Sequence, residues 1–208
     1  MKEYPIIFRG DMVNAIRARE KTLTRRVIKD PRRVGAELQL NKDRPPNFPC
    51  PYGYTGDHLW VRETWAAEHR FDGHAPRDIP KGVPIHYRSL EPGPSGLLWR
   101  PSIFIPRWMS CITLENTGVR IERLQDITEE DAVAEGVGYG FQMNGGWPDY
   151  QHIKNGICEL TQDSAQMSFA TLWESIHGID NPKAWKSNPW VWKTSFKMIK
   201  PAVTKVEG

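Results

Sequence analysis

The chain has 208 residues, of which 39% are hydrophobic and 25% are charged, and its formal net charge is +3. This length fits one domain of about 100–200 residues, which can bury a core without disulfide bonds. No apolar run approaches the roughly 18 residues of a membrane span. The opening residues also lack the apolar core of a signal peptide. We therefore expect a cytoplasmic protein, a single domain over residues 1–208 and no membrane partner.

The spacing of cysteine and histidine argues against a metal site. Cys50, Cys111 and Cys158 are far apart and form no CxxC pair, so neither a disulfide framework nor a zinc ribbon is predicted. The histidines form no HxxxH pair. The sequence therefore predicts no metal ion and no other cofactor, and Cys111 is expected in the core.

Charge is unevenly distributed along the chain. Residues 1–44 carry 12 basic and 6 acidic side chains, and residues 115–135 carry 2 basic and 7 acidic ones. Residues 181–208 are basic again, with 6 lysines and 1 glutamate. Two basic ends around an acidic middle predict a basic face that suits a phosphate-bearing partner. Solvated surfaces alone would give the same pattern.

The first part of the chain predicts two strands around one helix. Residues 4–9 and 21–27 have extended patterns, and Asp11 can cap a helix that runs to about Glu20. Five prolines predict a long irregular insertion near 30–55.

A further strand is predicted in HLWVRETWA, directly after Gly56–Asp57. Its apolar residues alternate onto one face, and Glu63 shares that face. A carboxylate on an apolar face must be paired or protonated. We therefore expect Glu63 either to form a buried salt bridge with Arg25 or Arg26, or to belong to a functional site.

Shorter strands are predicted in the middle of the chain. Residues 83–88 and 103–105 are candidates, within a second insertion near 67–109 that is rich in proline and glycine. Residues 110–124 predict either one bent strand or a hairpin about residues 116–118.

Two helices and a last strand complete the pattern. A capping box predicts a short helix that begins after Thr128 and ends at Gly136. After a third insertion near 137–162, an apolar stripe predicts a helix over 164–177 that Asp163 or Ser164 can cap. Residues 190–200 alternate as a strand. Strands outnumber helices without regular strand-helix-strand alternation, so the sequence predicts an α+β fold, a small β-barrel with peripheral helices.

The segment REKTLTRR, at residues 19–26, sets two threonines among basic side chains directly after the first helix. Alone, it could be a solvated turn or a phosphate-binding segment. In its context it resembles the early motif of the ASCH domain family, Gly-x-Lys-x-x-Glu/Thr-x-Arg. Lys21, Thr24 and Arg26 match this motif, and Arg19 stands at the family's glycine position.

Three later pieces follow in the order of that family. These are Gly56–Asp57 before a strand, the acidic stretch ITEEDAVAEGV, and a last strand containing Phe196. The opening PIIFRGDMVNAI and the closing NPWVWKTSF resemble phage and prophage proteins of this type, which implies a phage-encoded protein in a bacterial cell. The resemblance covers residues 1–66, 110–136 and 163–199. It implies a PUA-like barrel of about five or six strands.

Small ASCH proteins of this type include amidohydrolases that deacylate acetylated cytidine, ribonucleases and RNA-binding proteins. The resemblance implies a catalytic set of Lys21, Thr24 and Glu135, with Glu63 as the second choice of carboxylate. A threonine hydroxyl needs a base, and lysine is a base only if its pKa falls toward neutrality. Burial and nearby arginines lower that pKa, whereas a carboxylate raises it. The sequence leaves this competition open.

Basic and aromatic residues predict where a nucleic acid would bind. Trp60 and Trp108 each lie close to an arginine in the sequence and are the candidates for base stacking, while the other tryptophans on apolar faces belong to the core. Basic residues between Arg19 and Arg33 should make binding salt-dependent. The predicted nucleic-acid or substrate contacts are Arg19, Arg25, Arg26, Trp60, Arg62, Arg107 and Trp108.

The sequence therefore predicts a protein that binds RNA, single-stranded nucleic acid or a modified nucleoside at a concave site. Lys21 and Arg26 are expected on the wall of that site, with Glu63 or Glu135 within reach. Metal-independent hydrolysis of acylated cytidine or RNA is the predicted reaction. A non-catalytic nucleic-acid reader and a phage protein-interaction module remain as alternatives.

Overall fold

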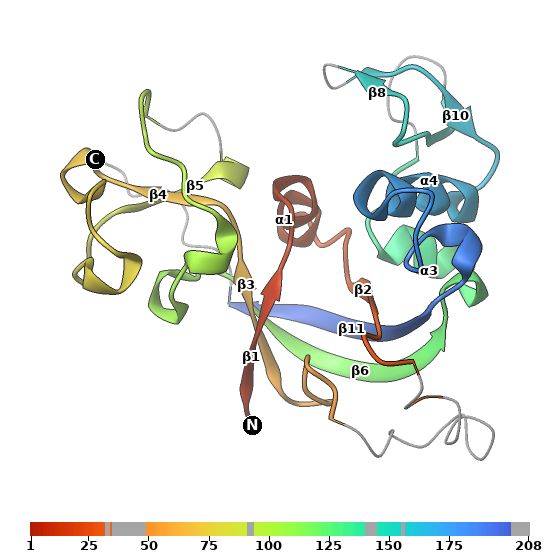
Figure 1. The fold of residues 1–208 in the computed structure, drawn as a ribbon, viewed down its shortest axis with the longest axis horizontal. Coiled ribbons are helices and arrows are strands. Elements are labelled where there is room, and N and C mark those ends of the chain that lie inside the picture. Colours follow the sequence, from red (N-terminus) through yellow and green to blue (C-terminus); the bar gives the residue numbers. More distant parts are fainter. Residues whose placement is uncertain (32–33, 35–48, 91–93, 140–144, 155–156, 201–208) are drawn as a thin grey trace. The chain divides into compact units, whose positions relative to one another are not determined.

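The computed structural model describes residues 1–31, 34, 49–90, 94–139, 145–154 and 157–200. In this part of the chain, five strands form one mixed sheet in the order β1-β3-β6-β11-β2 (Figure 1). The strands are β1 (Glu3–Ile7), β2 (Leu23–Val27), β3 (His58–Arg62), β6 (Thr113–Arg123) and β11 (Trp190–Lys200). The fold is α+β, as the sequence predicts.

In the described part of the chain, three α-helices and several short strands accompany the sheet. The helices are α1 (Gly10–Arg17), α3 (Glu129–Ala134) and α4 (Ala165–His177). The two-stranded pairs are β4 (Trp65–Ala67) with β5 (Ile85–Tyr87), β7 (Trp147–Pro148) with β10 (Thr161–Gln162), and β8 (Ile153–Lys154) with β9 (Ile157–Cys158). None of the described helices has the length and apolar character needed to cross a membrane.

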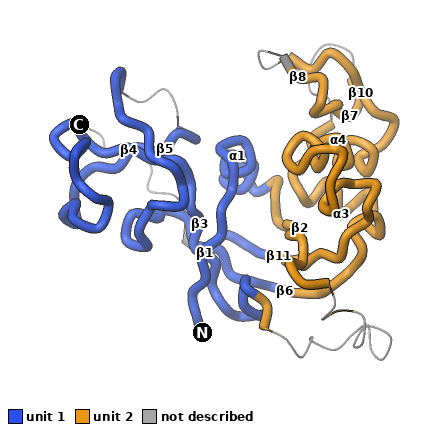
Figure 2. The backbone as a smooth tube through the Cα atoms, viewed as in Figure 1, with its two compact units in different colours: residues 1–19, 51–117, 196–208 blue, residues 20–50, 118–195 orange. Residues whose placement is uncertain are grey.

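The chain divides into two compact units (Figure 2). Unit 1 contains residues 1–19, 51–117 and 196–208, and unit 2 contains residues 20–50 and 118–195. Each unit is built from segments that are far apart in the sequence, and each has a hydrophobic core of its own.

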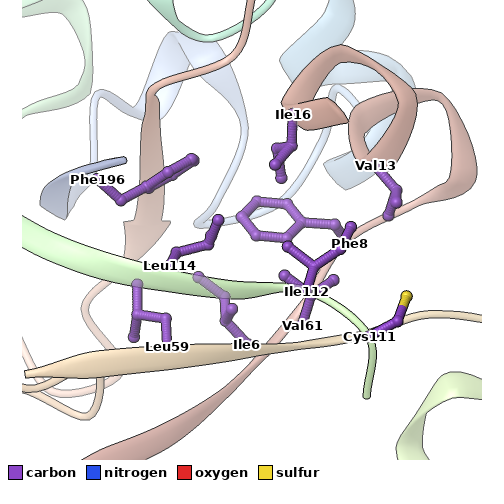
Figure 3. Packing of buried hydrophobic residues seen from close by; sticks show 10 residues of the cluster. All are labelled: Ile6, Phe8, Val13, Ile16, Leu59, Val61, Cys111, Ile112, Leu114 and Phe196. Carbon is purple, nitrogen blue, oxygen red and sulfur yellow. The ribbon is translucent and has the colours of Figure 1, made fainter. Parts of the chain in front are cut away.

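The main core of unit 1 forms between α1 and strands β1, β3 and β6. β1 runs parallel to β3, and β3 runs antiparallel to β6 with Leu59 opposite Leu114. Figure 3 shows Ile16 of α1 directed toward Phe8, whose ring centroid is 5.9 Å from that of Phe196. The buried residues of this core are Ile6, Phe8, Val13, Ile16, Leu59, Val61, Cys111, Ile112, Leu114 and Phe196. Cys111 is thus a core residue, as predicted.

The core of unit 2 forms between α3, α4 and the sheet. Both helices begin at the predicted caps: the Thr128 hydroxyl accepts from the Asp131 N–H, and the Ser164 hydroxyl accepts from the Met167 N–H. The apolar stripe of α4 is buried except for Ile176, which is exposed. The buried residues are Leu124, Ile127, Ala132, Val137, Ala165, Phe169, Leu172, Trp173 and Val191.

Residues 113–123 form a single strand, one of the two alternatives predicted for 110–124, rather than a hairpin. Asn116 continues the ladder there, since its N–H donates to the Asp57 carbonyl and its carbonyl accepts from the Gly56 N–H. Two other predicted strands differ from the observed ones. Residues 103–105 are not a strand, since Pro101 and Pro106 flank a single 3₁₀ turn there. The strand predicted after Gly56–Asp57 is divided into β3 and β4.

The sheet is open over the described residues. β1 and β2 stand at the two ends of the strand order, and no described pairing joins them. The barrel closure that the resemblance implies is therefore not observed there. Much of the insertion predicted near 30–55, including Arg32 and Arg33, lies outside the described residues. The insertion near 137–162 contains the short pairs β7–β10 and β8–β9.

Candidate functional site

Six charged side chains meet in unit 2 and are called the unit 2 charged cluster. Three are cations and three are carboxylates: Lys21, Arg25, Lys193, Glu122, Asp131 and Glu135. They come from the residues before β2, from β2, β6 and β11, and from α3 with its C-terminal cap. Burial of so many charges is tolerated because each has an oppositely charged partner.

Lys21 is the predicted base, and it is enclosed in this cluster. Its side chain is 1% exposed, and its Nζ donates to Glu135 Oε2 at 2.7 Å and to the Glu135 carbonyl oxygen at 2.6 Å. Burial lowers the pKa of Lys21, and this outweighs the opposing effect of the Glu135 carboxylate. The competition that the sequence leaves open thus resolves toward a lower pKa, which is the direction that a general base requires.

The end of α3 sets the position of Glu135. Gly136 has a φ of 92°, a conformation that favours glycine, so the chain turns immediately after Glu135. The Ala134 carbonyl accepts from the Thr22 N–H at 2.8 Å, which ties the residues before β2 to the end of the helix. The predicted pair of Lys21 and Glu135 is therefore held by backbone as well as by side chains.

Arg25 is fully enclosed and holds the three carboxylates of the cluster. Its Nε lies 2.8 Å from Glu122 Oε1, and its Nη1 lies 3.3 Å from Glu135 Oε1. Its Nη2 lies 2.5 Å from Asp131 Oδ2. The guanidinium is 0% exposed. The prediction that Arg25 contacts a nucleic acid needs correction, because this side chain faces carboxylates of its own chain.

Lys193 is a residue of the cluster that sequence reasoning missed. The lysines of residues 183–205 suit a solvated face or an extension of a nucleic-acid surface, but Lys193 is 4% exposed and pairs with Asp131. A signal was present: Lys193 shares a strand face with Val191, which is also buried. An acidic helix opposite that face supplies the partner that a buried lysine needs.

Thr24 and Arg26 lie on the other face of β2. The antiparallel register pairs Thr24 with Thr194, Arg25 with Lys193, and Arg26 with Trp192. Because side chains alternate along a strand, Thr24 points away from Arg25 and is a direct cross-strand neighbour of Thr194. Thr24 is buried and Arg26 is half-buried.

Arg19 keeps the turn that the family's glycine implies. Its φ is 62°, in the left-handed region that non-glycine residues rarely adopt. The departure from glycine therefore preserves the local backbone geometry at a cost in strain, and it places an exposed cation two residues before Lys21.

Glu63 belongs to a different group, the unit 1 polar cluster of Arg17, Glu63, Ser89 and Cys111. The expected salt bridge with Arg25 or Arg26 is wrong: the partner is Arg17, with its Nη2 3.2 Å from Glu63 Oε1. Ser89 Oγ donates to Glu63 Oε2, and Cys111 Sγ lies 3.6 Å from Oε1. Arg17 lies in the last turn of α1, a position from which it can reach a strand of its own unit.

Burial controls the titration of the unit 1 polar cluster. It raises the pKa of Glu63, although bonds from Ser89 and Arg17 oppose this effect. Burial also raises the pKa of Cys111 to about 11, so its thiol is a poor nucleophile at neutral pH. Glu63 and Cys111 therefore fit a packed polar group better than a reacting one.

The predicted stacking residue Trp60 lies between two arginines in unit 1. The guanidinium carbons of Arg62 and Arg107 are 5.0 Å and 6.0 Å from its ring centroid. Arg107 also forms two bonds with Glu3, and Arg62 donates to a backbone carbonyl. Trp108 packs against the second apolar cluster of unit 1. The Trp60 ring therefore has two cations within 6.0 Å of its centroid.

Metal ligands do not gather in the described part of the chain, where no three His, Cys, Asp or Glu side chains are arranged to hold an ion. The candidate site is thus the segment from Lys21 to Arg26 together with Glu135, all in unit 2. The structure brings Lys21, Arg25 and Glu135 together, and it assigns Glu63 to unit 1.

Comparison with known proteins gives two likenesses among solved structures. No family model matches the chain, and no curated protein matches it significantly. One similar structure is a DUF984-family protein from Enterococcus faecalis V583, with 10% identity, a TM-score of 0.41, and coverage of 100% of this chain and 87% of that one. The other has 12% identity, a TM-score of 0.38, and coverage of 96% of this chain and 80% of that one. It is an ASCH domain from Lactobacillus crispatus JV V101, and so bears the name of the family that the chain's own motifs resemble.

Proposed function

We propose that this ASCH-type chain binds RNA or a modified nucleoside and hydrolyses the acyl group of an acylated cytidine without a metal ion. The observation that carries the proposal is Lys21. A buried lysine with a lowered pKa, fixed by the Glu135 carboxylate, loses its proton at lower pH than an exposed lysine. Thr24, three residues on, supplies a hydroxyl on the same segment.

In the proposed reaction, the neutral amine of Lys21 takes the proton of Thr24 Oγ1, and this oxygen attacks the carbonyl carbon of the acyl amide. The C–N bond breaks, and Lys21 gives the proton to the leaving amine of cytidine. Water then hydrolyses the ester on Thr24, which releases the carboxylic acid and restores the hydroxyl. Glu135 does not react, and it binds Lys21 Nζ before the proton transfer.

The pleat of β2 gives this reaction a strict geometric requirement. Thr24 points away from Arg25, because side chains alternate between the two faces of β2. Lys21 precedes the strand, so this alternation does not determine the direction of its side chain. In the structure Lys21 Nζ is bound to Glu135, which also contacts Arg25, so the proposed reaction requires the Lys21 side chain to turn from Glu135 toward Thr24. Thr24→Val distinguishes this mechanism from one in which Lys21 activates water. The variant should lose turnover if Thr24 is the nucleophile and keep it if water is.

For nucleic-acid binding, we propose two arginines as phosphate or carbonyl contacts: Arg19, the last residue of the first segment of unit 1, and Arg26 in unit 2. In unit 1, Trp60 with Arg62 and Arg107 offers an aromatic ring and two cations. Guanidinium groups and aromatic rings are the usual contacts of single-stranded nucleic acids. Binding through them should weaken as salt rises, because neutralised phosphates release counterions.

The deciding experiment offers acylated cytidine and short RNAs to chelator-treated protein. Wild type should release free cytidine, and Lys21→Met should reduce turnover by about 10²–10⁴-fold, the usual contribution of a positioned general base. Lys186→Met is the matched control, since it removes a lysine that is 65% exposed and should leave turnover unchanged. Thermal unfolding of each variant verifies that it is folded.

Three results would contradict the proposed reaction. Turnover that survives Lys21→Met would assign it to another site, and turnover that requires added metal would exclude the mechanism. Salt-sensitive RNA binding without turnover would make the chain a non-catalytic reader. Absence of binding even at low salt would favour a protein-interaction module.

A further inference from the structure

Thr194 is a buried hydroxyl of unit 2 that the proposed reaction leaves unused. The residue is 0% exposed, and its Oγ1 has no hydrogen-bond partner among the residues that the structure describes. An unpaired hydroxyl in the interior is unfavourable, and few such groups occur in native proteins. Valine would fill nearly the same volume without this penalty. We therefore infer that the hydroxyl has a function of its own.

The register of β11 and β2 points to the group that Thr194 serves. Thr194 is directly opposite Thr24, on the face away from Arg25. Directly opposite residues have Cβ atoms about 4.5–5.5 Å apart. Rotation of a threonine about χ1 moves its hydroxyl between discrete staggered positions, which brings two opposed hydroxyls within bonding reach. Thr24 is thus the polar side chain that Thr194 can meet by a single rotamer change.

We propose that Thr194 is a positioning residue for Thr24, and this inference rests on the proposed function of Thr24 as nucleophile. When Thr24 Oγ1 loses its proton to Lys21, the Thr194 O–H donates to that oxygen and keeps its own proton. A hydrogen bond to an ionised oxygen is stronger than one between neutral groups. A donor without a resting partner is available when charge develops. Thr194 itself is enclosed and does not touch the substrate.

Thr194→Val and Thr194→Ser test this role through two opposite effects. Thr194→Val should lower kcat by about 10–10²-fold with KM unchanged, because the ionised Thr24 oxygen loses one charge-assisted hydrogen bond. The same variant should raise the melting temperature by about 2–4 °C, because it removes an unpaired buried hydroxyl. Thr194→Ser keeps the donor and should restore most of kcat. A purely structural hydroxyl would change stability without changing kcat.

Thr171→Val is the matched control for the loss of a threonine hydroxyl in unit 2. The Thr171 hydroxyl is fully used: it accepts from the Tyr150 N–H at 2.9 Å and donates to the Ser168 carbonyl at 2.8 Å. This variant should lower the melting temperature and leave kcat unchanged. The opposite signs of the two melting shifts identify Thr194 as the unpaired hydroxyl.

A second measurement separates Thr194 from the choice of substrate. p-Nitrophenyl acetate can acetylate an activated hydroxyl, and mass spectrometry of peptides locates the acetyl group. Acetylation of Thr24 in wild type and its loss in Thr194→Val support the inference, even if acylated cytidine is not a substrate. Equal acetylation or equal kcat in both proteins would overturn it, as would a wild type whose Thr24 is never acetylated. A lower melting temperature in Thr194→Val would also overturn it.

Discussion

The unit 1 polar cluster and the unit 2 charged cluster bury carboxylates with different neighbours. In unit 1, burial raises the pKa of Glu63, because Ser89 and the one cation, Arg17, do not compensate for lost solvent. In unit 2, burial also opposes ionisation of Asp131, but Lys193 and Arg25 together hold its pKa below the usual value. The pKa of Asp131 therefore shifts in the opposite direction to that of Glu63, because Asp131 contacts two cations and its carboxyl is more exposed.

This difference shows what each cluster can do. In the unit 2 charged cluster, Lys193 and Arg25 lower the pKa of Asp131, and the Glu135 carboxylate binds Lys21 while burial lowers the pKa of the amine. In the unit 1 polar cluster the pKa of Glu63 is raised, and the residue forms a polar contact between α1 and the residues after β3. Charge balance, more than the presence of a buried glutamate, distinguishes a candidate site from a structural contact.

The largest expected effect comes from breaking the unit 2 charged cluster at its centre. Arg25→Ala leaves three carboxylates with two lysines, and we expect the free energy of unfolding to fall by about 3–5 kcal/mol, as for other buried ion pairs that lose one partner. Urea unfolding measures this loss. Arg120→Ala, which removes a 65% exposed arginine next to Glu122, should change stability little. A loss below about 1 kcal/mol for Arg25→Ala would mean that water replaces the guanidinium.

A smaller, pH-dependent effect should appear in unit 1. Because the pKa of Glu63 is raised in the folded state, its proton stabilises the fold below the ordinary pKa of about 4.3. This contribution to the stability of wild type is lost as the pH rises through the pKa of Glu63 in the folded state. In Glu63→Gln the side chain cannot ionise, so the free energy of unfolding should not fall for this reason. The stability of wild type relative to Glu63→Gln should therefore decline from pH 4 to pH 7 in urea unfolding.

The control for this pH dependence is Glu68→Gln, which alters a surface glutamate with a side chain that is 39% exposed. Its unfolding free energy should follow that of wild type across the same pH range. A constant difference between wild type and Glu63→Gln would show that Arg17 keeps Glu63 ionised throughout, and the contrast between the two clusters would disappear.

The smallest expected effect concerns Arg19, where unit 1 gives way to unit 2 along the chain. Arg19→Gly should raise the unfolding free energy by about 0.5–1 kcal/mol, because relief of left-handed strain exceeds the added entropy of glycine in the unfolded chain. Arg19→Ala keeps the strain and should give no gain. If Arg19 also binds phosphate, Arg19→Gly should weaken RNA binding while stabilising the fold. Differential scanning calorimetry and a salt titration measure the two effects separately.

Local signals in the sequence predicted most of the elements that position the site. The caps at Thr128 and Ser164 and the extended segment at 21–27 are confirmed. The pairing of Lys21 with Glu135 is also observed. It was predicted from the order of the motifs along the chain and not from a local sequence pattern. The catalytic roles of Lys21, Thr24 and Glu135 stay predictions.

Long-range pairing explains what the sequence could not predict. The position of Glu63 on an apolar face predicted a buried partner. Which arginine is that partner depends on how α1 packs, because Arg17 is distant from Glu63 in the sequence. Burial of Lys193 depends on the acidic residues of α3 across the fold. Thr194 carries no signal by itself, because its importance comes from a register that only the sheet defines.

The late position of β11 has a consequence for synthesis of the protein. β2 has its described partner in β11, and Phe8 packs against Phe196, although these residues are separated by most of the chain. In a nascent chain that has not yet reached β11, the core of unit 1 lacks Phe196, and β2 of unit 2 lacks its strand partner. Folding must await the synthesis of β11, and contacts of such high sequence separation form slowly. Until then the early strands and α1 leave the ribosome without their final partners, which exposes them to chaperones and to proteolysis.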